Sequence, residues 1–176
     1  MIIKGPVLPI PHANVDTDQI IPAKYLTTID ETGMGEFCFS GMTDGRKMLE
    51  KHFGAVVWVA GENVGCGSSR EHAAWALLGA GIKAVISPSF ARIFHENCYM
   101  NGLVPVIVDA ALIPRFAAAN FITIDVDNET VQADQDPPIK FSLDPARKQF
   151  VLGGGFLKYL NSKIPAIRAW EAKRAS

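Results

Sequence analysis

Cysteine is scarce in this sequence. Its 176 residues include only three cysteines, Cys38, Cys66 and Cys98, and no two of them form a C-x-x-C pair. An odd number of widely spaced cysteines does not build a disulfide framework, and it does not supply the clustered ligands of a zinc or iron–sulfur site. We therefore expect Cys38 and Cys98 to be reduced and mostly buried, and we expect no metal or cofactor on this chain.

Long apolar runs and an excess of one charge are also missing. The longest strongly apolar run, residues 55–60, is far shorter than the roughly 20 residues that span a bilayer. Residues 1–11 are interrupted by prolines and lack the segments of a secretory signal. The formal net charge is −1, and scattered charges argue against binding to nucleic acid or to a membrane. These features predict a cytoplasmic globular protein, and the length predicts a single domain over residues 1–176.

Short apolar segments alternate with helical patterns in the middle of the chain. Residues 55–61, 83–89 and 103–109 are typical of strands that are buried on both faces. The two intervals between them, 70–81 and 89–102, have apolar residues at helical spacing. This β-α-β-α-β order predicts an α/β fold with a parallel sheet and right-handed crossovers.

The flanking segments have other patterns. Residues 121–133 alternate between apolar and polar side chains, as in a β-hairpin. A short helix is predicted within residues 143–155, and a closing amphipathic helix over residues 164–174. Residues 27–45 are glycine-rich and weakly patterned, and we expect a long loop there. Residue type indicates two helix N-caps, which are Ser89 and Asp144.

The stretch GCGSSREH, residues 65–72, lies between a predicted strand and a predicted helix. A P-loop would need a lysine after its last glycine, and a dinucleotide fingerprint would need glycine in place of Arg70. A nucleophile elbow would need a glycine two residues after its serine, and His72 is a poor triad base on the same helix. The remaining features are Ser68, Ser69 and Arg70 at a helix start, which favour binding of an anion. Helix capping is the competing interpretation, but one cap needs only one serine.

A second concentration of polar residues is NVDTDQIIPAKYL, residues 14–26. Asn14, Asp16 and Asp18 stand where an EF-hand places its first ligands, but Gln19 replaces the glycine that the loop requires. We therefore reject a calcium loop. An Asx-rich turn before a helix or strand and a functional role both remain open.

Three stretches, DTDQIIPAKYL, GENVGCGSSREHAAWAL and SPSFARIFHENCYMNGLVPV, resemble the small subunits of 3-isopropylmalate dehydratase, the swivelling domain of the aconitase superfamily. The resemblance covers most of residues 5–110 and implies a β/β/α domain with a mainly parallel central sheet. It implies a hydro-lyase of leucine biosynthesis that isomerises 2-isopropylmalate to 3-isopropylmalate by removing water and adding it back. It further implies a hetero-oligomer with a large subunit, whose [4Fe–4S] cluster acts as Lewis acid.

The same resemblance implies roles for individual residues. Ser68 corresponds to the base that removes the carbon-bound proton. Ser69 and Arg70 correspond to residues that grip a substrate carboxylate, and Thr17 and Asp18 reach the same site.

The substrate is expected to depend on residues 23–33. Aconitase has an arginine in this loop that grips an extra carboxylate, but the first arginine after the DTD stretch here is Arg46. Tyr25 and Leu26 offer apolar surface and Thr27 is uncharged, which favours an isopropyl or methyl group on a malate-type diacid. A related hydro-lyase acting on homoaconitate or a methyl-substituted malate, and a non-catalytic swivelling or anion-binding domain, remain alternatives.

Overall fold

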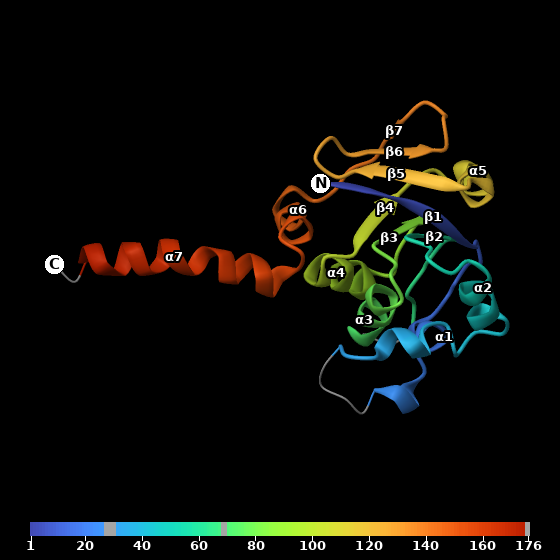
Figure 1. Ribbon diagram of the computed structural model, residues 1–176, viewed down its shortest axis with the longest axis horizontal. Helices are drawn as coiled ribbons and strands as arrows, with labels where there is room; N and C mark the ends of the chain where they lie inside the picture. The colour runs from blue at the N-terminus through green and yellow to red at the C-terminus, as the bar shows by residue number, and fades with distance from the viewer. Residues whose placement is uncertain (27–30, 68–69, 175–176) are drawn as a thin grey trace.

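A computed structural model describes residues 1–26, 31–67 and 70–174, which form a body and one projecting helix (Figure 1). Seven strands in these ranges form one mixed sheet in the order β4-β3-β2-β1-β5-β6-β7. The strands are β1 (Ile2–Ile10), β2 (Val57–Ala60), β3 (Ala84–Ser87), β4 (Val104–Ile107), β5 (Phe121–Asp125), β6 (Thr130–Ala133) and β7 (Ile139–Lys140).

The described helices differ widely in length. The α-helices are α1 (Thr17–Ile20), α2 (Gly45–Lys51), α3 (His72–Gly79), α4 (Arg92–Asn101), α5 (Ile113–Ala118), α6 (Pro145–Leu152) and α7 (Phe156–Arg174). The 3₁₀ turns are η1 (Ala23–Tyr25), η2 (Met34–Phe37) and η3 (Ala110–Leu112). None of the described helices is both long enough and apolar enough to cross a membrane.

The parallel part of the sheet confirms the β-α-β-α-β prediction. Strands β2, β3 and β4 form within the three predicted apolar segments, with α3 and α4 between them. The sequence pattern did not predict β1, which pairs in parallel with β2 through partners such as Val7 and Val57. β1 also pairs antiparallel with β5, for example at Ile3 and Ile124. The N-terminal strand therefore joins the parallel and antiparallel halves, and the predicted hairpin, β5–β6, extends the sheet.

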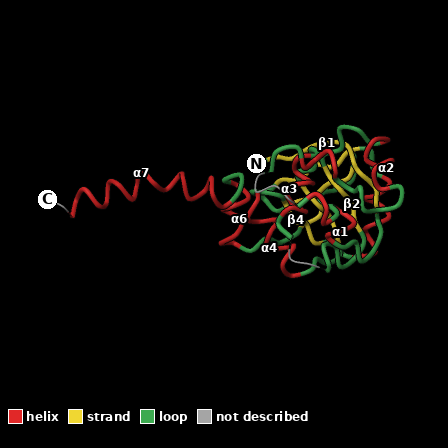
Figure 2. The backbone as a smooth tube through the Cα atoms, turned by 90° about the horizontal axis from the view of Figure 1, so that it is seen from below, coloured by secondary structure: helices red, strands yellow, loops and turns green. Residues whose placement is uncertain are grey.

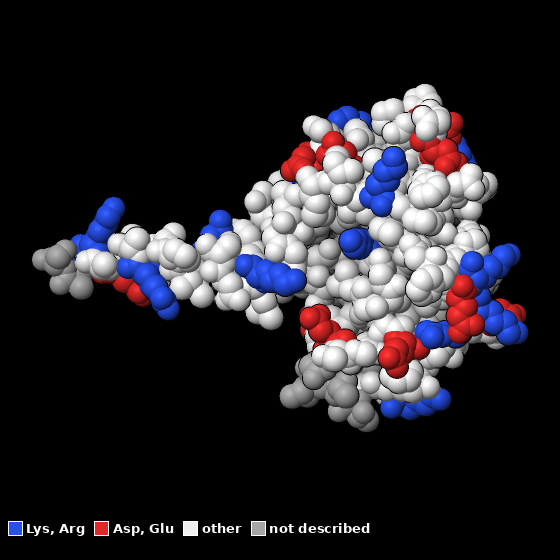
Figure 3. Space-filling model, viewed as in Figure 1, with Lys and Arg blue, Asp and Glu red and all other residues white. Residues whose placement is uncertain are grey.

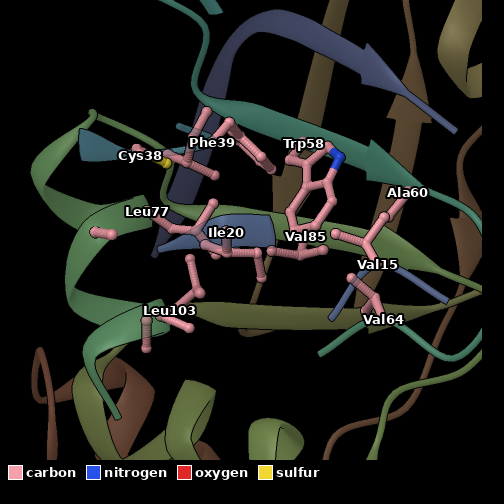
Figure 4. Packing of buried hydrophobic residues seen from close by; sticks show 14 of the residues in the cluster. Val15, Ile20, Cys38, Phe39, Trp58, Ala60, Val64, Leu77, Val85 and Leu103 are labelled. Carbon is pink, nitrogen blue, oxygen red and sulfur yellow. The ribbon is translucent and has the colours of Figure 1, made fainter. Parts of the chain in front are cut away.

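Alternate residues of the central strands enter two separate apolar clusters. Trp58 and Val85 belong to one cluster and Val57 and Ile86 to the other, because successive strand residues point to opposite faces of a sheet. The indole of Trp58 is fully buried, and its Nε1 donates a 3.2 Å hydrogen bond to the carbonyl of Ile10. Figure 4 shows the first cluster, in which Trp58 lies among side chains from helices, such as Ile20 and Leu77, and from loops, such as Val15 and Val64.

Three predicted boundaries need correction. Ser89 is not the N-cap of α4, because the helix begins at Arg92 after Ala91, and the Ser89 hydroxyl instead accepts a hydrogen bond from the Asn63 N–H.

The closing helix is longer than residues 164–174 and begins at Phe156. The expected loop 27–45 contains the turn η2, whose Met34 is buried. The Asp144 cap is confirmed, since its carboxylate accepts from the N–H groups of residues 146 and 147.

Candidate functional site

The two polar stretches of the sequence lie side by side in the structure. The Thr17 N–H donates to the Cys66 carbonyl at 3.1 Å, and the Gly65 N–H donates to the Val15 carbonyl at 2.7 Å. Asp16 and Cys66 form an isolated parallel bridge. These main-chain bonds hold residues 14–18 parallel to residues 63–67, so the C-terminal ends of the two segments lie next to each other.

A pair of asparagines joins the two stretches at their other end. The Asn63 side-chain Nδ2 donates to the Asn14 Oδ1 at 2.8 Å, and both residues have φ of +55°. Asparagine tolerates this left-handed conformation better than most residues, because its short side-chain amide can form hydrogen bonds with the neighbouring backbone. The sequence pattern did not predict this pair. Its only local signal is asparagine in a turn, which does not reveal a partner 49 positions away.

Asp16 and Asp18 have different tasks. The Asp16 carboxylate accepts from the Gln19 N–H at 2.7 Å, and the Gln19 side chain accepts from the Asp16 N–H at 2.9 Å. This reciprocal capping box holds the start of α1, which confirms an Asx-type turn before a helix. Asp18 lies in the first turn and is half exposed, so its carboxylate can reach a neighbouring segment.

Arg70 supplies that neighbouring group. Its Nη1 forms an ion pair with the Asp18 Oδ1, which also accepts from the Ala23 N–H at 3.2 Å. The Arg70 side chain is 21% exposed and Asp18 is 52% exposed, so the guanidinium lies at the surface but is largely enclosed. Arg70 precedes α3, which begins at His72. The structure thus brings together two of the residues that the sequence assigned to one carboxylate site.

Two glycines allow the loop to follow this path. Gly65 has φ of +78°, and a Cβ there would lie 2.1 Å from the Phe94 Cγ of α4. Gly67 has φ of +86°, and a Cβ there would lie 3.4 Å from the Asp16 Cβ. The loop therefore passes against α4 on one side and against the DTD stretch on the other, where larger residues would be strained or excluded.

The remaining predicted site residues are placed as follows. Thr17 is 1% exposed and lies below the surface. The Tyr25 ring stacks on Phe37 with centroids 4.1 Å apart, and Leu26 is half-buried against the first apolar cluster. Ser68, Ser69 and Thr27 lie outside the described residues.

Glu71 and His72 follow Arg70. A Glu71 carboxylate oxygen accepts from the Asn101 amide at 3.0 Å, and the Trp75 indole donates to the other atom of that amide at 2.7 Å. His72 contacts the Trp75 ring, with centroids 4.8 Å apart. Glu71 therefore holds the start of α3 against the end of α4, consistent with a positioning role.

The cysteines are free thiols, as predicted for Cys38 and Cys98. Burial raises the pKa of both of these thiols well above the usual range, so they stay protonated. Cys66 lies at the site, its Sγ donates to the Asn14 carbonyl at 3.4 Å, and burial followed by the charge of Asp16 raises its pKa. Within the described ranges, no three His, Cys, Asp or Glu side chains are grouped to hold a metal ion.

Comparison with known proteins identifies the family to which this chain belongs. The family model for the aconitase C-terminal domain matches residues 1–111, which include both polar stretches. A 3-isopropylmalate dehydratase small subunit from Xanthobacter autotrophicus is 39% identical, and the alignment covers 99% of this chain and 95% of that protein. One from Rhodopseudomonas palustris is 42% identical, with 97% and 93% covered. The chain belongs to the 3-isopropylmalate dehydratase small-subunit family.

A solved structure of the same family agrees with this assignment. The 3-isopropylmalate dehydratase structure from Methanocaldococcus jannaschii superimposes with a TM-score of 0.80 at 36% identity, covering 97% of this chain and 99% of that one. The family and the mixed α/β fold that the sequence predicted are thereby confirmed. The 3-isopropylmalate dehydratase small-subunit family also accounts for the C-terminal third, since the relatives align over nearly the whole chain.

Proposed function

We propose that this chain is the small subunit of a 3-isopropylmalate dehydratase, and that it isomerises 2-isopropylmalate to 3-isopropylmalate with a large subunit. The observation that carries the proposal is the ion pair between Arg70 and Asp18, which joins the two polar stretches at one surface site. We also propose that the chain acts as one swivelling domain in the cytoplasm, as in a biosynthetic enzyme, without nucleic acid or membrane.

In this proposal Arg70 binds a substrate carboxylate. A guanidinium has five N–H donors in a planar fork, and Asp18 accepts from one of its nitrogens. Other donors can therefore pair with a carboxylate while Asp18 keeps the group oriented. Ser69 and the N–H groups at the start of α3 would bind the same carboxylate, because a helix N-terminus favours negative charge.

Ser68 is proposed as the base that accepts the carbon-bound proton. A serine hydroxyl is hardly ionised at neutral pH, and each pKa unit of correction requires about 1.36 kcal/mol. The positive end of α3 and the guanidinium of Arg70 favour a serine oxyanion, and they act most strongly once water is excluded. We propose that the large subunit closes the site and excludes the water.

The large subunit would also hold the [4Fe–4S] cluster, which supplies a Lewis acid for the departing hydroxyl. The thiols of this chain do not fit that group, because Cys38 and Cys98 are buried and protonated and Cys66 stands alone at the site. The residues of this chain would therefore bind, orient and deprotonate the substrate.

The test uses the assembled enzyme, prepared by co-expressing this chain with its large subunit. Ser68→Ala is expected to lower kcat with 2-isopropylmalate at least about a thousandfold with little change in substrate binding, because a base acts in the transition state. Ser40→Ala, on an exposed serine outside the site, is the control. Activity of the Ser68 variant within about tenfold of wild type would refute the assignment of the base.

A further inference from the structure

The Asn101 side chain connects the end of α4 to the start of α3. Its amide nitrogen donates to a Glu71 carboxylate oxygen at 3.0 Å and to the Asn97 carbonyl at 2.9 Å. Its amide oxygen accepts from the Trp75 indole at 2.7 Å. The two helices pack against each other on the side of the body from which α7 projects (Figures 1 and 2). The amide thus has partners for both of its hydrogens and for its oxygen.

These three partners determine which side chain fits at position 101. A carboxylate and a carbonyl can only accept hydrogen bonds, and an indole N–H can only donate one. The side chain between them must offer two donors and one acceptor, as the amide of asparagine does. An ionised aspartate has no donor, and an aliphatic side chain has neither group. The hydrogen bonds around Asn101 are therefore specific for an amide.

Glu71 lies where its charge would affect the proposed substrate site. It is the N-cap residue of α3, but its side chain makes no capping hydrogen bond. The preceding residue, Arg70, pairs with Asp18 of α1. Arg70 and the N–H groups at the start of α3 are the donors that the proposed function assigns to a substrate carboxylate. The Glu71 carboxylate is an acceptor for the same donors, because the N-terminus of a helix attracts negative charge.

The surroundings of the Asn101 amide suit the charge of Glu71. Both residues line a groove between β1, α3, the end of α4 and the start of α7. The other charged side chains that line the described part of this groove are three lysines and one glutamate: Lys4, Lys83, Lys158 and Glu31. Figure 3 shows basic side chains on the body beside the start of the projecting helix. The lysines outnumber the glutamates, so this wall favours a carboxylate.

We propose that Asn101 is a positioning residue for the dehydratase reaction. Its amide holds the Glu71 carboxylate at α4, so that Glu71 does not compete with the substrate for Arg70 and for the start of α3. The inference rests on the proposed function, because it concerns the same carboxylate site. Without the amide, Glu71 would accept hydrogen bonds from those donors itself. The apparent affinity for substrate would then fall in proportion to the fraction of enzyme whose site is open.

Four forms of the assembled enzyme test the inference: wild type, Asn101→Ala, Glu71→Ala and the double variant. Asn101→Ala is expected to raise KM for 2-isopropylmalate about tenfold, which corresponds to a site that Glu71 occupies about nine-tenths of the time. Saturating substrate displaces Glu71, so kcat is expected to change less than about twofold. Glu71→Ala and the double variant are expected to keep a KM near that of wild type, because both lack the competing carboxylate.

A purely structural role of the bond would give another pattern. Each single variant and the double variant would lose the same bond, and all three would raise KM alike. Glu71→Gln is a further control, since its amide oxygen can still accept from Asn101 and it carries no charge, so KM is expected to stay near wild type. Asn161→Ala, at an exposed position of α7, controls for loss of an amide elsewhere. Urea unfolding of each variant reports whether the fold is kept.

Two results would overturn the inference. The first is a double variant whose KM is as high as that of Asn101→Ala, and the second is a normal KM for Asn101→Ala. Both are judged against an active wild type, so they leave the proposed function standing. A wild-type enzyme that does not convert 2-isopropylmalate would refute the proposed function, and the same four proteins would then be titrated with malate by calorimetry. Weaker malate binding by Asn101→Ala that the second substitution restores would support the inference, whereas no binding by wild type, or no restoration, would overturn it too.

Discussion

Arg70 and Asp18, which are 52 positions apart in the sequence, form an ion pair between Nη1 and Oδ1. Asp18 extends from the first turn of α1, and Arg70 lies just before α3. The pair joins the ends of two stretches whose main chains are already hydrogen-bonded to each other. Asp18 thus orients the guanidinium in the free chain, and in the proposed function this would reduce the entropy lost when a substrate carboxylate binds.

The shape of the Arg70 side chain should matter as much as its charge. In the assembled enzyme, Arg70→Lys is expected to raise KM for 2-isopropylmalate about tenfold to a hundredfold, nearly as much as Arg70→Ala. Lysine keeps the charge but loses the planar fork, and one charge-assisted hydrogen bond contributes about 1.5–3 kcal/mol. Arg46→Lys, in an exposed ion pair with Glu50, is the control. Normal KM for the Arg70→Lys enzyme would show that no bidentate contact is made.

The close approach of the site loop to α4 should make Gly65 intolerant of a side chain. Gly65→Ala would place a methyl group 2.1 Å from the Phe94 ring and is expected to lower the free energy of unfolding by at least about 2 kcal/mol. Gly54→Ala has a similar φ of +81° but no atom within 4 Å, so it isolates the backbone strain, about 1 kcal/mol. Urea unfolding of both variants measures the difference. Equal losses would mean that the contact with Phe94 contributes nothing.

Thr27 should influence which malate is turned over. Thr27→Arg is expected to shift the ratio of kcat/KM toward tricarboxylates such as homoaconitate, since burying a third carboxylate requires a cationic partner. Wild type is expected to prefer 2-isopropylmalate, and smaller alkyl malates should also react, because a missing methylene is worth only about 1–3 kcal/mol. Assays of the assembled enzyme with both substrate classes test this. Higher kcat/KM of wild type for homoaconitate would contradict it.

His95 should make stability depend on pH. Burial lowers the pKa of His95, whose ring stacks on Phe90 and meets Tyr99 edge-on. The nearby charges of Glu96 and Asp144 oppose this shift, and Arg147 adds to it. The unfolded chain then binds a proton at higher pH than the folded chain, so the free energy of unfolding falls as pH drops below about 6.5.

Replacing the histidine tests this dependence. His95→Gln is expected to flatten the stability profile between about pH 6.5 and the folded pKa, by up to about 1.4 kcal/mol per pH unit. His12→Gln, at an exposed position, is the control. An unchanged slope for the His95 variant, measured by urea unfolding at several pH values, would exclude His95 as its source.

The purified chain is expected to bind no stoichiometric iron and to show no dehydratase activity without its large subunit. Two of its three thiols are buried, and an iron–sulfur cluster needs several thiolates together. Metal analysis and an absorption spectrum after anaerobic reconstitution measure this. A stoichiometric cluster on the single chain would contradict the proposed division of labour between the subunits.

Local sequence patterns were sufficient to predict most of the helices and strands in the middle of the chain. Strands β2 to β4 are continuous apolar runs, and α3 and α4 have apolar residues at helical spacing. The Asp144 cap was also predictable, because an N-cap depends on neighbours within a few residues. The two polar stretches could be found from residue types, and Arg70 and Asp18 could be assigned from their resemblance to a family.

Other features were decided only by the tertiary structure. β1 contains Gly5, Pro6 and Pro9, which weaken any strand pattern, and it forms because β2 and β5 bond to it from both sides. Gly5 is required there because a Cβ would lie 2.4 Å from Val56. No local pattern could reveal this contact.

The alignment of the site was likewise decided at long range. The bonds from Thr17 to Cys66 and from Asn63 to Asn14 connect residues about 50 positions apart. The first is a main-chain bond, which nearly every residue type can form, and the second joins two asparagine side chains, which are common in turns. Neither identifies its partner in the sequence. The residue types of the site were determined by the sequence itself, whereas the fold decided that Asp18 and Arg70 meet, because packing of β1 against β2 brings their loops together.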